Sequence, residues 1–300
     1  MQTTIHDLLV GEDPILLDGA TGTILFEMGL QFGDSPELWN VDYPEKIREV
    51  HRAYIRAGSQ VILTNTFGCN RKRLELHKLS DRTIELNQAA AKLAREEADA
   101  ASNPVLVAGS IGPTGSILMP YGDMEYEEAV EVFGEQIRAL AMSGIDCFWI
   151  ETMSDLGEVK AAVEACQKLA PDIPIVATMT FDTHGRTMMG VTPENALETL
   201  SGLSIVALGG NCGNGTAEIA TVIQKMSQTN SDVILVAKSN AGIPHLEQGV
   251  AVYDATPEDM ADYARSVHQM GARFIGGCCG STPEHIRAMA QALGKGAPAV

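Results

Sequence analysis

The chain has 300 residues, of which 45% are hydrophobic and 20% charged, a balance that is ordinary for a folded protein and excludes intrinsic disorder. Its 39 acidic and 21 basic residues give a formal net charge of -18, spread along the sequence. Because such a surface repels polyanions, we expect no nucleic-acid partner. The sequence has neither an N-terminal signal segment nor an apolar run of roughly 18 residues, so it predicts a cytoplasmic protein without a membrane partner.

Short apolar segments recur along the whole chain and predict eight β-strands. They lie at 14–19, 60–66, 104–112, 147–152, 173–181, 205–212, 233–240 and 273–279. Their nearly continuous apolar character is typical of parallel strands buried on both faces, and segments with helical periodicity separate them. The alternation predicts an α/β protein in which residues 1–300 form a single (β/α)8 TIM-type barrel, with an open doubly wound sheet as the alternative.

Polar residues stand where the predicted strands end. They are Asp18, Asn65, Ser110, Glu151, Cys212, Asn240, Cys278 and Cys279. The strand interiors are almost wholly apolar, and in a TIM barrel the C-terminal strand ends carry the chemistry. We therefore expect these side chains to converge on one mouth of the barrel.

Three of these residues are cysteines with glycine neighbours: Cys212 in GGNC, and Cys278 and Cys279 in GGCCG. Three thiolates are a ligand set that zinc prefers, and the glycines allow the bend by which two adjacent residues reach one ion. The fourth zinc position is then open to a substrate thiol, whereas a structural site would fill it with His245 or His285. Plain burial is the remaining alternative. We expect it for the isolated cysteines, Cys69, Cys147 and Cys166.

Two acidic residues stand at the same predicted mouth. Asp18 precedes the turn GATGT, and Glu151 ends the fourth predicted strand. Two carboxylates suit the ammonium group of an amino acid, and backbone N–H groups of the turn that begins at Gly19 suit its carboxylate. A general acid and base pair is the alternative interpretation.

The motifs LLDGATGT, AGSQVILTNTFGCNR, AGSIGPTG, IET, GGNC and FIGGCCGSTPEHIRAM, in this order, resemble the zinc-dependent homocysteine S-methyltransferase family across essentially the whole chain. The stretches GDSPELWNVDYPEKI, RTMMGVT and SNAGIPHLEQGVAVYDATP look most like the bacterial betaine-homocysteine methyltransferases. The resemblance implies zinc held by Cys212, Cys278 and Cys279, and homocysteine anchored through Asp18 and Glu151. It also implies that the homocysteine thiol enters the open zinc position, loses its proton and attacks the methyl group of a donor, forming methionine.

A quaternary ammonium donor, of which glycine betaine is our first choice, requires aromatic faces around its charge. Trp39, in the first predicted strand-to-helix loop, is the first candidate for this contact. Other aromatic residues near loops or strand ends are Tyr43, Phe67, Tyr121, Trp149 and Phe181. The sequence departs from the animal betaine enzymes at Gly68 and Thr152, where those enzymes carry aromatic residues.

Two alternatives to glycine betaine are open. The donor can be a sulfonium compound, such as dimethylsulfoniopropionate, S-methylmethionine or S-adenosylmethionine. Alternatively, the chain is a homocysteine-activating module that receives the methyl group from a corrinoid carrier partner, as in cobalamin-dependent methionine synthase. Each alternative is compatible with a homo-oligomer.

Overall fold

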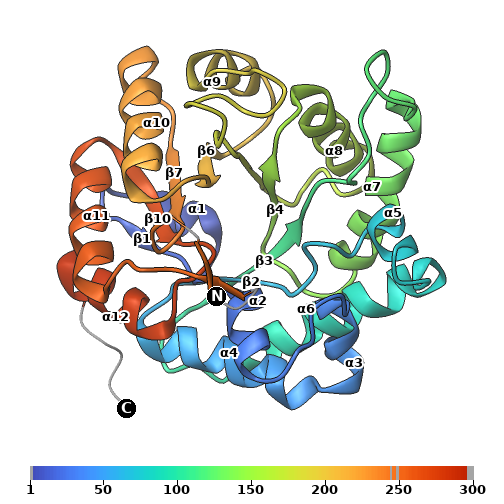
Figure 1. The fold of residues 1–300 in the computed structure, drawn as a ribbon, viewed down its shortest axis with the longest axis horizontal. Coiled ribbons are helices and arrows are strands. Elements are labelled where there is room, and N and C mark those ends of the chain that lie inside the picture. Colours follow the sequence, from blue (N-terminus) through green and yellow to red (C-terminus); the bar gives the residue numbers. More distant parts are fainter. Residues whose placement is uncertain (1–2, 244, 248–249, 296–300) are drawn as a thin grey trace.

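The computed structural model describes residues 3–243, 245–247 and 250–295. Eight parallel strands form one sheet in the order β1-β10-β7-β6-β5-β4-β3-β2. A parallel bridge from Leu17 to Val61 connects the two ends of this order, so the sheet curls into a barrel. Figure 1 shows the ring of strands inside a ring of helices. The predicted (β/α)8 barrel is confirmed, and the alternative of an open doubly wound sheet is wrong.

Each of the eight predicted apolar segments overlaps one observed strand, although the fourth strand ends one residue later than predicted and the last barrel strand begins one residue earlier. The barrel strands are β1 (Ile15–Leu16), β2 (Val61–Leu63), β3 (Leu106–Ile111), β4 (Cys147–Met153), β5 (Ile175–Met179), β6 (Ala207–Cys212), β7 (Leu235–Ser239) and β10 (Ala272–Gly277). A small antiparallel hairpin, β8 (His245–Glu247) and β9 (Val250–Val252), follows β7 and was not predicted.

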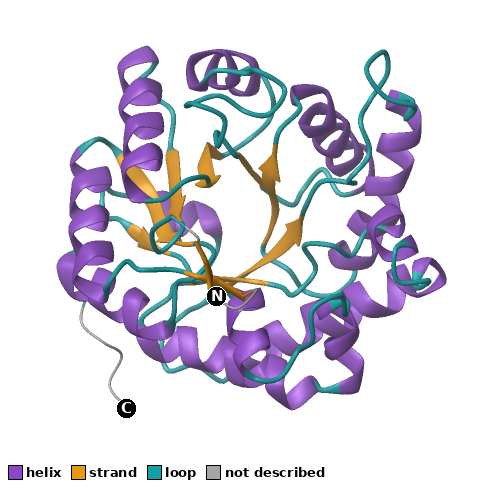
Figure 2. Cartoon of the chain, viewed as in Figure 1, coloured by secondary structure: helices purple, strands orange, loops and turns teal. Residues whose placement is uncertain are grey.

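Helices surround the barrel on its outside and, for the first helix, at its N-terminal end, where Ile5 packs with the inward-facing strand residues (Figure 2). They are α1 (Ile5–Leu9), α2 (Thr21–Glu27), α3 (Trp39–Asp42), α4 (Pro44–Ala57), α5 (Arg71–Glu75), α6 (Thr83–Asp99), α7 (Tyr126–Ala141), α8 (Leu156–Leu169), α9 (Pro193–Ser201), α10 (Thr216–Thr229), α11 (Pro257–Gln269) and α12 (Pro283–Ala292), with 3-10 turns η1 (Pro36–Leu38) and η2 (Ser80–Arg82). Local signals fix several ends: the Asp155 side chain caps α8, Thr192 caps α9, and Gly58, with a φ of 111°, ends α4. No helix within the described ranges is both long and apolar enough to cross a membrane.

Inward-facing side chains from alternate strand positions fill the N-terminal part of the barrel. We call this set the lower interior: Ile15, Leu17, Val61, Leu63, Leu106, Ala108, Cys147, Trp149, Val176, Ala207, Val236 and Phe274. All are buried and apolar, and the rings of Trp149 and Phe274 meet edge to face with centroids 5.8 Å apart. The barrel is therefore a packed core below its mouth and not a pore.

Candidate active site

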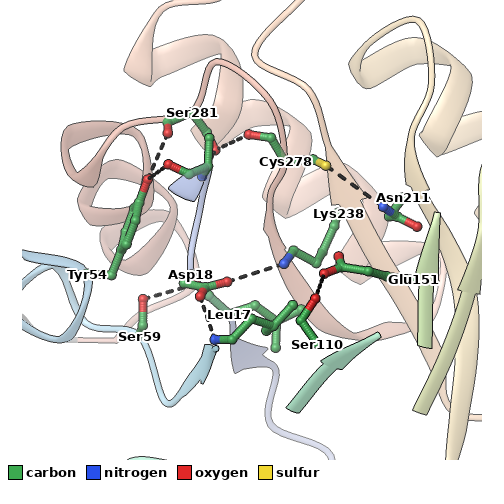
Figure 3. A network of polar contacts seen from close by, with 12 residues as sticks. Leu17, Asp18, Tyr54, Ser59, Ser110, Glu151, Asn211, Lys238, Cys278 and Ser281 are labelled. Atoms are coloured by element: carbon green, nitrogen blue, oxygen red, sulfur yellow. Dashed lines mark hydrogen bonds and ion pairs between the residues drawn. The ribbon is translucent and has the colours of Figure 1, made fainter. Parts of the chain in front are cut away.

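Further along the strands, toward their C-terminal ends, the inward side chains become polar. We call this set the upper layer: Asp18, Ser110, Glu151, Thr178, Asn211, Lys238 and Cys278. The register places Asn211 of β6 beside Lys238 of β7, and Lys238 beside Gly276 of β10. Figure 3 shows the side chains of Asp18, Lys238, Glu151 and Cys278 gathered in one space. The predicted convergence of polar strand ends is thus confirmed for Asp18, Glu151 and Cys278, whereas Lys238 was not among the predicted residues.

The three cysteines of the predicted zinc site come together at the ends of β6 and β10. The Sγ atom of Cys212 lies 3.2 Å from that of Cys278 and 3.7 Å from that of Cys279. Thiolates about 2.3 Å from one tetrahedral zinc ion stand roughly 3.8 Å apart, so the cluster has the size of a zinc site. Its ligand atoms lie within 4.8 Å of one another, and no described His, Asp or Glu belongs to the group.

Breaks in the strand backbone aim the adjacent thiols at one point. The N–H of Cys278 still donates to the Ser239 carbonyl at 2.7 Å, which continues the pairing with β7. The N–H of Ser281 then donates to the Cys278 carbonyl, closing a turn through Cys279 and Gly280, whose φ is 77°. The last residue of β6, the third cysteine, also lies in the left-handed region, with a φ of 64°. The alternation of strand side chains therefore ends at Cys278, which allows the adjacent side chains of Cys278 and Cys279 to face the same way.

The other three cysteines are isolated, buried thiols, as predicted. They are Cys69, Cys147 and Cys166. Burial raises the pKa of each of them. In the cluster, by contrast, hydrogen bonds from the thiols of Cys212 and Cys278 lower the pKa of Cys279 to about 3. Within the cluster the pKa of Cys279 is thus lowered while those of Cys212 and Cys278 are raised, whereas at the isolated cysteines the shift is upward at every position.

The two histidines considered as structural zinc ligands make other contacts. His285 Nδ1 accepts the N–H of Thr282 at 3.0 Å, and its Nε2 lies 2.8 Å from the Ala255 carbonyl. His245 Nδ1 lies 3.3 Å from the carboxylate of Asp254. Within the described residues, neither histidine supports a four-ligand structural site.

Asp18 and Glu151 face the same space, and the Lys238 ammonium group stands between them (Figure 3). Asp18 Oδ1 lies 3.2 Å from Lys238 Nζ, and its Oδ2 accepts the Leu63 N–H at 2.7 Å. Glu151 Oε1 accepts the Ser110 hydroxyl at 2.6 Å. Burial raises the pKa of Asp18, and raises that of Glu151 to about 7, while the charge of Lys238 opposes both shifts.

Lys238 is one of two site residues, with Asn211, that were not predicted from the sequence. Its side chain is 4% exposed, and burial disfavours its charge, but Asp18 and Glu151 outweigh that effect and raise the pKa of Lys238. The expectation that strand interiors are almost wholly apolar is therefore wrong at this position. The signal was present as a single lysine near the end of the apolar segment VILVAKSN, at an inward position of the alternation.

Asn211, the residue before Cys212, connects the strand end that carries Glu151 to the cysteine cluster. Its Oδ1 accepts the Thr152 N–H at 2.8 Å and the Thr178 hydroxyl at 2.7 Å. Its Nδ2 donates to Thr152 Oγ1 at 2.7 Å and to Cys278 Sγ at 3.8 Å. Thr152 has a φ of 60°, which is strained for a β-branched residue. This amide thus fixes the strand end that carries Glu151 relative to a thiol of the cluster.

The turn after Asp18 is tightly packed. A Cβ atom at Gly19 would lie 2.7 Å from Ser281 Oγ and 2.8 Å from Tyr54 Cε1, so only glycine fits. The next N–H, of Ala20, donates to the Ser281 carbonyl at 3.2 Å. Ala20 is therefore engaged, and the predicted binding of a substrate carboxylate by this turn remains a prediction that centres on the N–H of Gly19.

Trp39, the predicted donor contact, is only 6% exposed and lies in α3. Its ring packs against that of Tyr43 at an interplanar angle of 54°, with centroids 4.8 Å apart, and Lys46 Nζ lies 4.5 Å from its centroid. Its face thus already meets a cation of its own segment, and its role in donor binding remains a prediction. Of the other aromatic candidates, Trp149 and Phe181 are buried, while Tyr43, Phe67 and Tyr121 are exposed.

Two of the predicted strand-end residues hold loops. Asn65 Nδ2 donates to the Pro36 carbonyl at 2.8 Å and to Asn40 Oδ1 at 2.9 Å, which fixes the loop after β1. Asn240 Nδ2 donates to the Gly213 carbonyl at 2.7 Å, beside the thiol cluster.

Comparison with known proteins identifies relatives of the whole barrel. Residues 15–293 match the family model of homocysteine S-methyltransferase. The methionine synthases of Mycobacterium tuberculosis and Mycobacterium leprae are 33% and 31% identical to the chain over 92% and 98% of its length. The chain spans only about a quarter of these relatives, 24% and 25%. The oxidized structure of the homocysteine methyltransferase MmuM from Escherichia coli has a TM-score of 0.83, with 27% identity over 97% of this chain and 99% of that one; its metallated form has a TM-score of 0.81.

Proposed function

The chain belongs to the homocysteine S-methyltransferase family, and from this premise we propose that it methylates the thiol of homocysteine with a small onium donor, forming methionine. The observation that carries the proposal is the thiol cluster of Cys212, Cys278 and Cys279 beside the carboxylates of Asp18 and Glu151. The first group suits a soft metal, and the second suits an amino-acid ammonium group. One substrate that carries both a thiol and an ammonium group satisfies both.

In this proposal the three cysteines hold zinc. The spacing of their Sγ atoms, 3.2 Å and 3.7 Å, supports the assignment, as does the metallated form of the related MmuM structure. When bound, zinc would supply Lewis acidity that lowers the pKa of a substrate thiol and so provides a nucleophile at neutral pH. The role of the chain itself is to present three thiolates on one side and leave the mouth side to substrate.

The carboxylates orient homocysteine. Glu151 has one oxygen engaged by Ser110, which leaves its other oxygen for the substrate ammonium group, and Asp18 is held toward the same space by Leu63 and Lys238. These contacts fix the amino-acid end of the substrate and direct its thiol to the cysteines. The alternative of a general acid and base pair is unnecessary, because the methyl transfer needs no proton from the protein: the thiol would release its proton to solvent on binding, and the donor would leave as a neutral amine or thioether.

We infer that glycine betaine is the first candidate for the methyl donor and that a sulfonium compound is the second. In either case the methyl group leaves a cationic centre, which becomes neutral as the new carbon–sulfur bond forms. Trp39 remains our original candidate for the aromatic contact. Two others lie nearer the mouth: Phe67 packs over the end of β3 at Gly112, and Tyr253 hydrogen-bonds Cys279. Aromatic faces at these positions suit a diffuse cation.

A corrinoid carrier as donor is the second candidate, and a specific feature favours it. Large apolar side chains are exposed on the loops that follow the strands, around the mouth. They are Phe32, Phe67, Ile117, Met119, Tyr121, Met188 and Ile243. A small donor does not need such a rim, whereas a protein that brings the methyl group to the mouth would bury it.

Methionine formation tests the proposal directly. Zinc-loaded protein is mixed with homocysteine and, separately, with glycine betaine, dimethylsulfoniopropionate, S-methylmethionine and S-adenosylmethionine. Turnover with glycine betaine supports the first choice, and turnover with a sulfonium alone supports the second. If homocysteine binds but every small donor fails, methylcobalamin and a corrinoid protein are tried next. A protein that does not bind homocysteine at all contradicts the proposed function.

A further inference from the structure

The feature that the proposed reaction does not require is the buried lysine of the upper layer. Lys238 is 3% exposed as a whole residue, and its Nζ lies 3.2 Å from Asp18 and 5.9 Å from the ring centroid of Trp149. A cationic substrate group is already expected between Asp18 and Glu151, so a second cation in the same space calls for an explanation.

The surroundings of Asp18 supply one. The titratable groups that face its carboxylate are Lys238 from β7, Glu151 from β4, Cys278 after β10 and Tyr54 from α4. Lys238 is the only cation among these groups, and the carboxylate and thiol neighbours disfavour a second negative charge. Burial of a carboxylate favours its neutral form, and two neighbouring carboxylates hold on to a shared proton. A neutral carboxyl group at this position would be a poor partner for an ammonium group.

We propose that Lys238 is a positioning residue that keeps Asp18 ionised and pointed at the mouth, so that the ammonium group of homocysteine meets two carboxylates. The inference rests on the proposed homocysteine binding and deepens it. Lys238 acts through Asp18, because it forms a direct ion pair with that residue. Its charge affects Glu151 only at longer range, without a direct contact. The substrate ammonium group then enters without a change in protonation of Asp18.

The first test compares Lys238→Met with the parent protein. The dissociation constant of homocysteine is measured by calorimetry on zinc-loaded protein from pH 6.5 to 9, in two buffers of different ionisation enthalpy. At pH 7 we expect binding to weaken about tenfold, the size of a lost contact to a charged group. The ratio of variant to parent should fall toward one as pH rises, because Asp18 then ionises without help. At pH 7 the variant should also release about one more proton on binding, since the thiol proton is common to both proteins.

Lys225→Met is the matched control, because Lys225 is a partly exposed lysine of α10 that pairs with Glu194 on the outside of the barrel. Its homocysteine affinity should equal that of the parent at every pH. A constant tenfold loss across the pH range in Lys238→Met, with no extra proton, would overturn the inference and reduce Lys238 to a packing role.

A second comparison keeps the test decisive if Lys238→Met folds poorly. In the Asp18→Asn background, Lys238 has no carboxylate left to hold ionised at that position. Asp18→Asn/Lys238→Met should therefore bind homocysteine at most about threefold more weakly than Asp18→Asn alone, the remainder coming from the longer-range effect of Lys238 on Glu151. A further tenfold loss in the double variant contradicts the proposal. Absence of homocysteine binding in the parent overturns the proposed function as well, whereas normal parental binding with additive losses overturns this inference alone.

Discussion

The lower interior and the upper layer succeed each other along one barrel, and every strand except β2 contributes to both, either directly or through the residues just after its end. On β4 the inward residues run Cys147, Trp149 and Glu151, and on β7 they run Val236 and Lys238. Below the step the side chains are apolar and packed on one another; above it they are charged or hydrogen-bonded. The difference shows that stability and chemistry occupy separate levels of one scaffold, which on β4 and β7 lie only two residues of sequence apart.

The two levels also differ in how their polar atoms are satisfied. In the lower interior the indole Nε1 of Trp149 is buried and has no hydrogen-bond partner among the residues that the structure describes. In the upper layer each oxygen of Asp18 and the side-chain oxygen and nitrogen of Asn211 have partners. The apolar packing of the lower interior thus tolerates an unpaired N–H group. In the upper layer, hydrogen bonds and the ion pair fix the side chains of Asp18 and Asn211 before substrate binds.

The largest expected effect is on zinc content, which should depend on the cysteine of the upper layer and not on that of the lower interior. Cys278→Ser should lose most zinc and all methyl transfer, because it removes one of three soft ligands, while the barrel stays folded. Zinc is measured by elemental analysis and folding by circular dichroism. Cys147→Ala, on an inward cysteine of the lower interior, is the matched control and should keep about one zinc per chain at a loss of about 1 kcal/mol in stability. Normal activity in Cys278→Ser would remove the metal assignment.

The second prediction reverses the roles. Phe274→Ala empties a fully buried site of the lower interior on β10, four residues before Cys278. We expect a loss of about 3–5 kcal/mol in the free energy of unfolding, from lost transfer energy and the cavity. Zinc content and homocysteine affinity should stay within twofold at temperatures where the variant is folded. Loss of zinc from folded Phe274→Ala would show that the two levels are not independent.

The sequence allowed the fold and most of the site to be predicted, because both depend on strong local patterns. The eight apolar segments mark the strands, and the glycine-flanked cysteines stand where a parallel barrel must bring strand ends together. Asp18 and Glu151 follow the same logic. Each of these residues is the last polar group of an apolar run, so its position can be read without knowing its neighbours.

The rest could not be predicted because it depends on pairing across the barrel. Lys238 is functional only beside Asp18, which lies 220 positions away in sequence. Asn211 links Thr152 to Cys278 through contacts that no local pattern announces. Trp39 was expected in a loop, where its ring could contact a donor. It lies instead in the short helix α3, buried and with Lys46 over its ring. Side-chain partners between distant strands are fixed by register, which a single sequence does not supply.

The third prediction concerns affinity and not stability. Glu151→Gln keeps the shape of the upper layer and removes its charge, so the KM for homocysteine should rise about 10- to 100-fold, as for a lost hydrogen bond to a charged group. The kcat should change by less than about threefold, because the thiol still reaches the cysteines. Glu158→Gln is a control at a buried carboxylate that accepts the Thr114 N–H and hydroxyl away from the cluster. An unchanged KM in Glu151→Gln would exclude Glu151 from substrate binding.

The smallest expected effect lies in the hydrogen bond that holds Glu151. The pKa of Glu151 is raised to about 7, mainly by burial, and the Ser110 hydroxyl opposes that shift. Ser110→Ala should therefore raise the pKa of Glu151 further. If it moves by about one unit, the ionised fraction at pH 7 falls from about a half to about a tenth, and the homocysteine KM rises roughly fivefold. Because raising the pH ionises the carboxyl group in both proteins, the ratio of their KM values should return to about one by pH 9.

Thr178→Val, which removes a hydroxyl bonded to Asn211 and not to Glu151, serves as control and should show no such pH dependence. A Ser110→Ala defect that is equally large at pH 7 and pH 9 would mean that Ser110 shapes the pocket without setting the charge of Glu151.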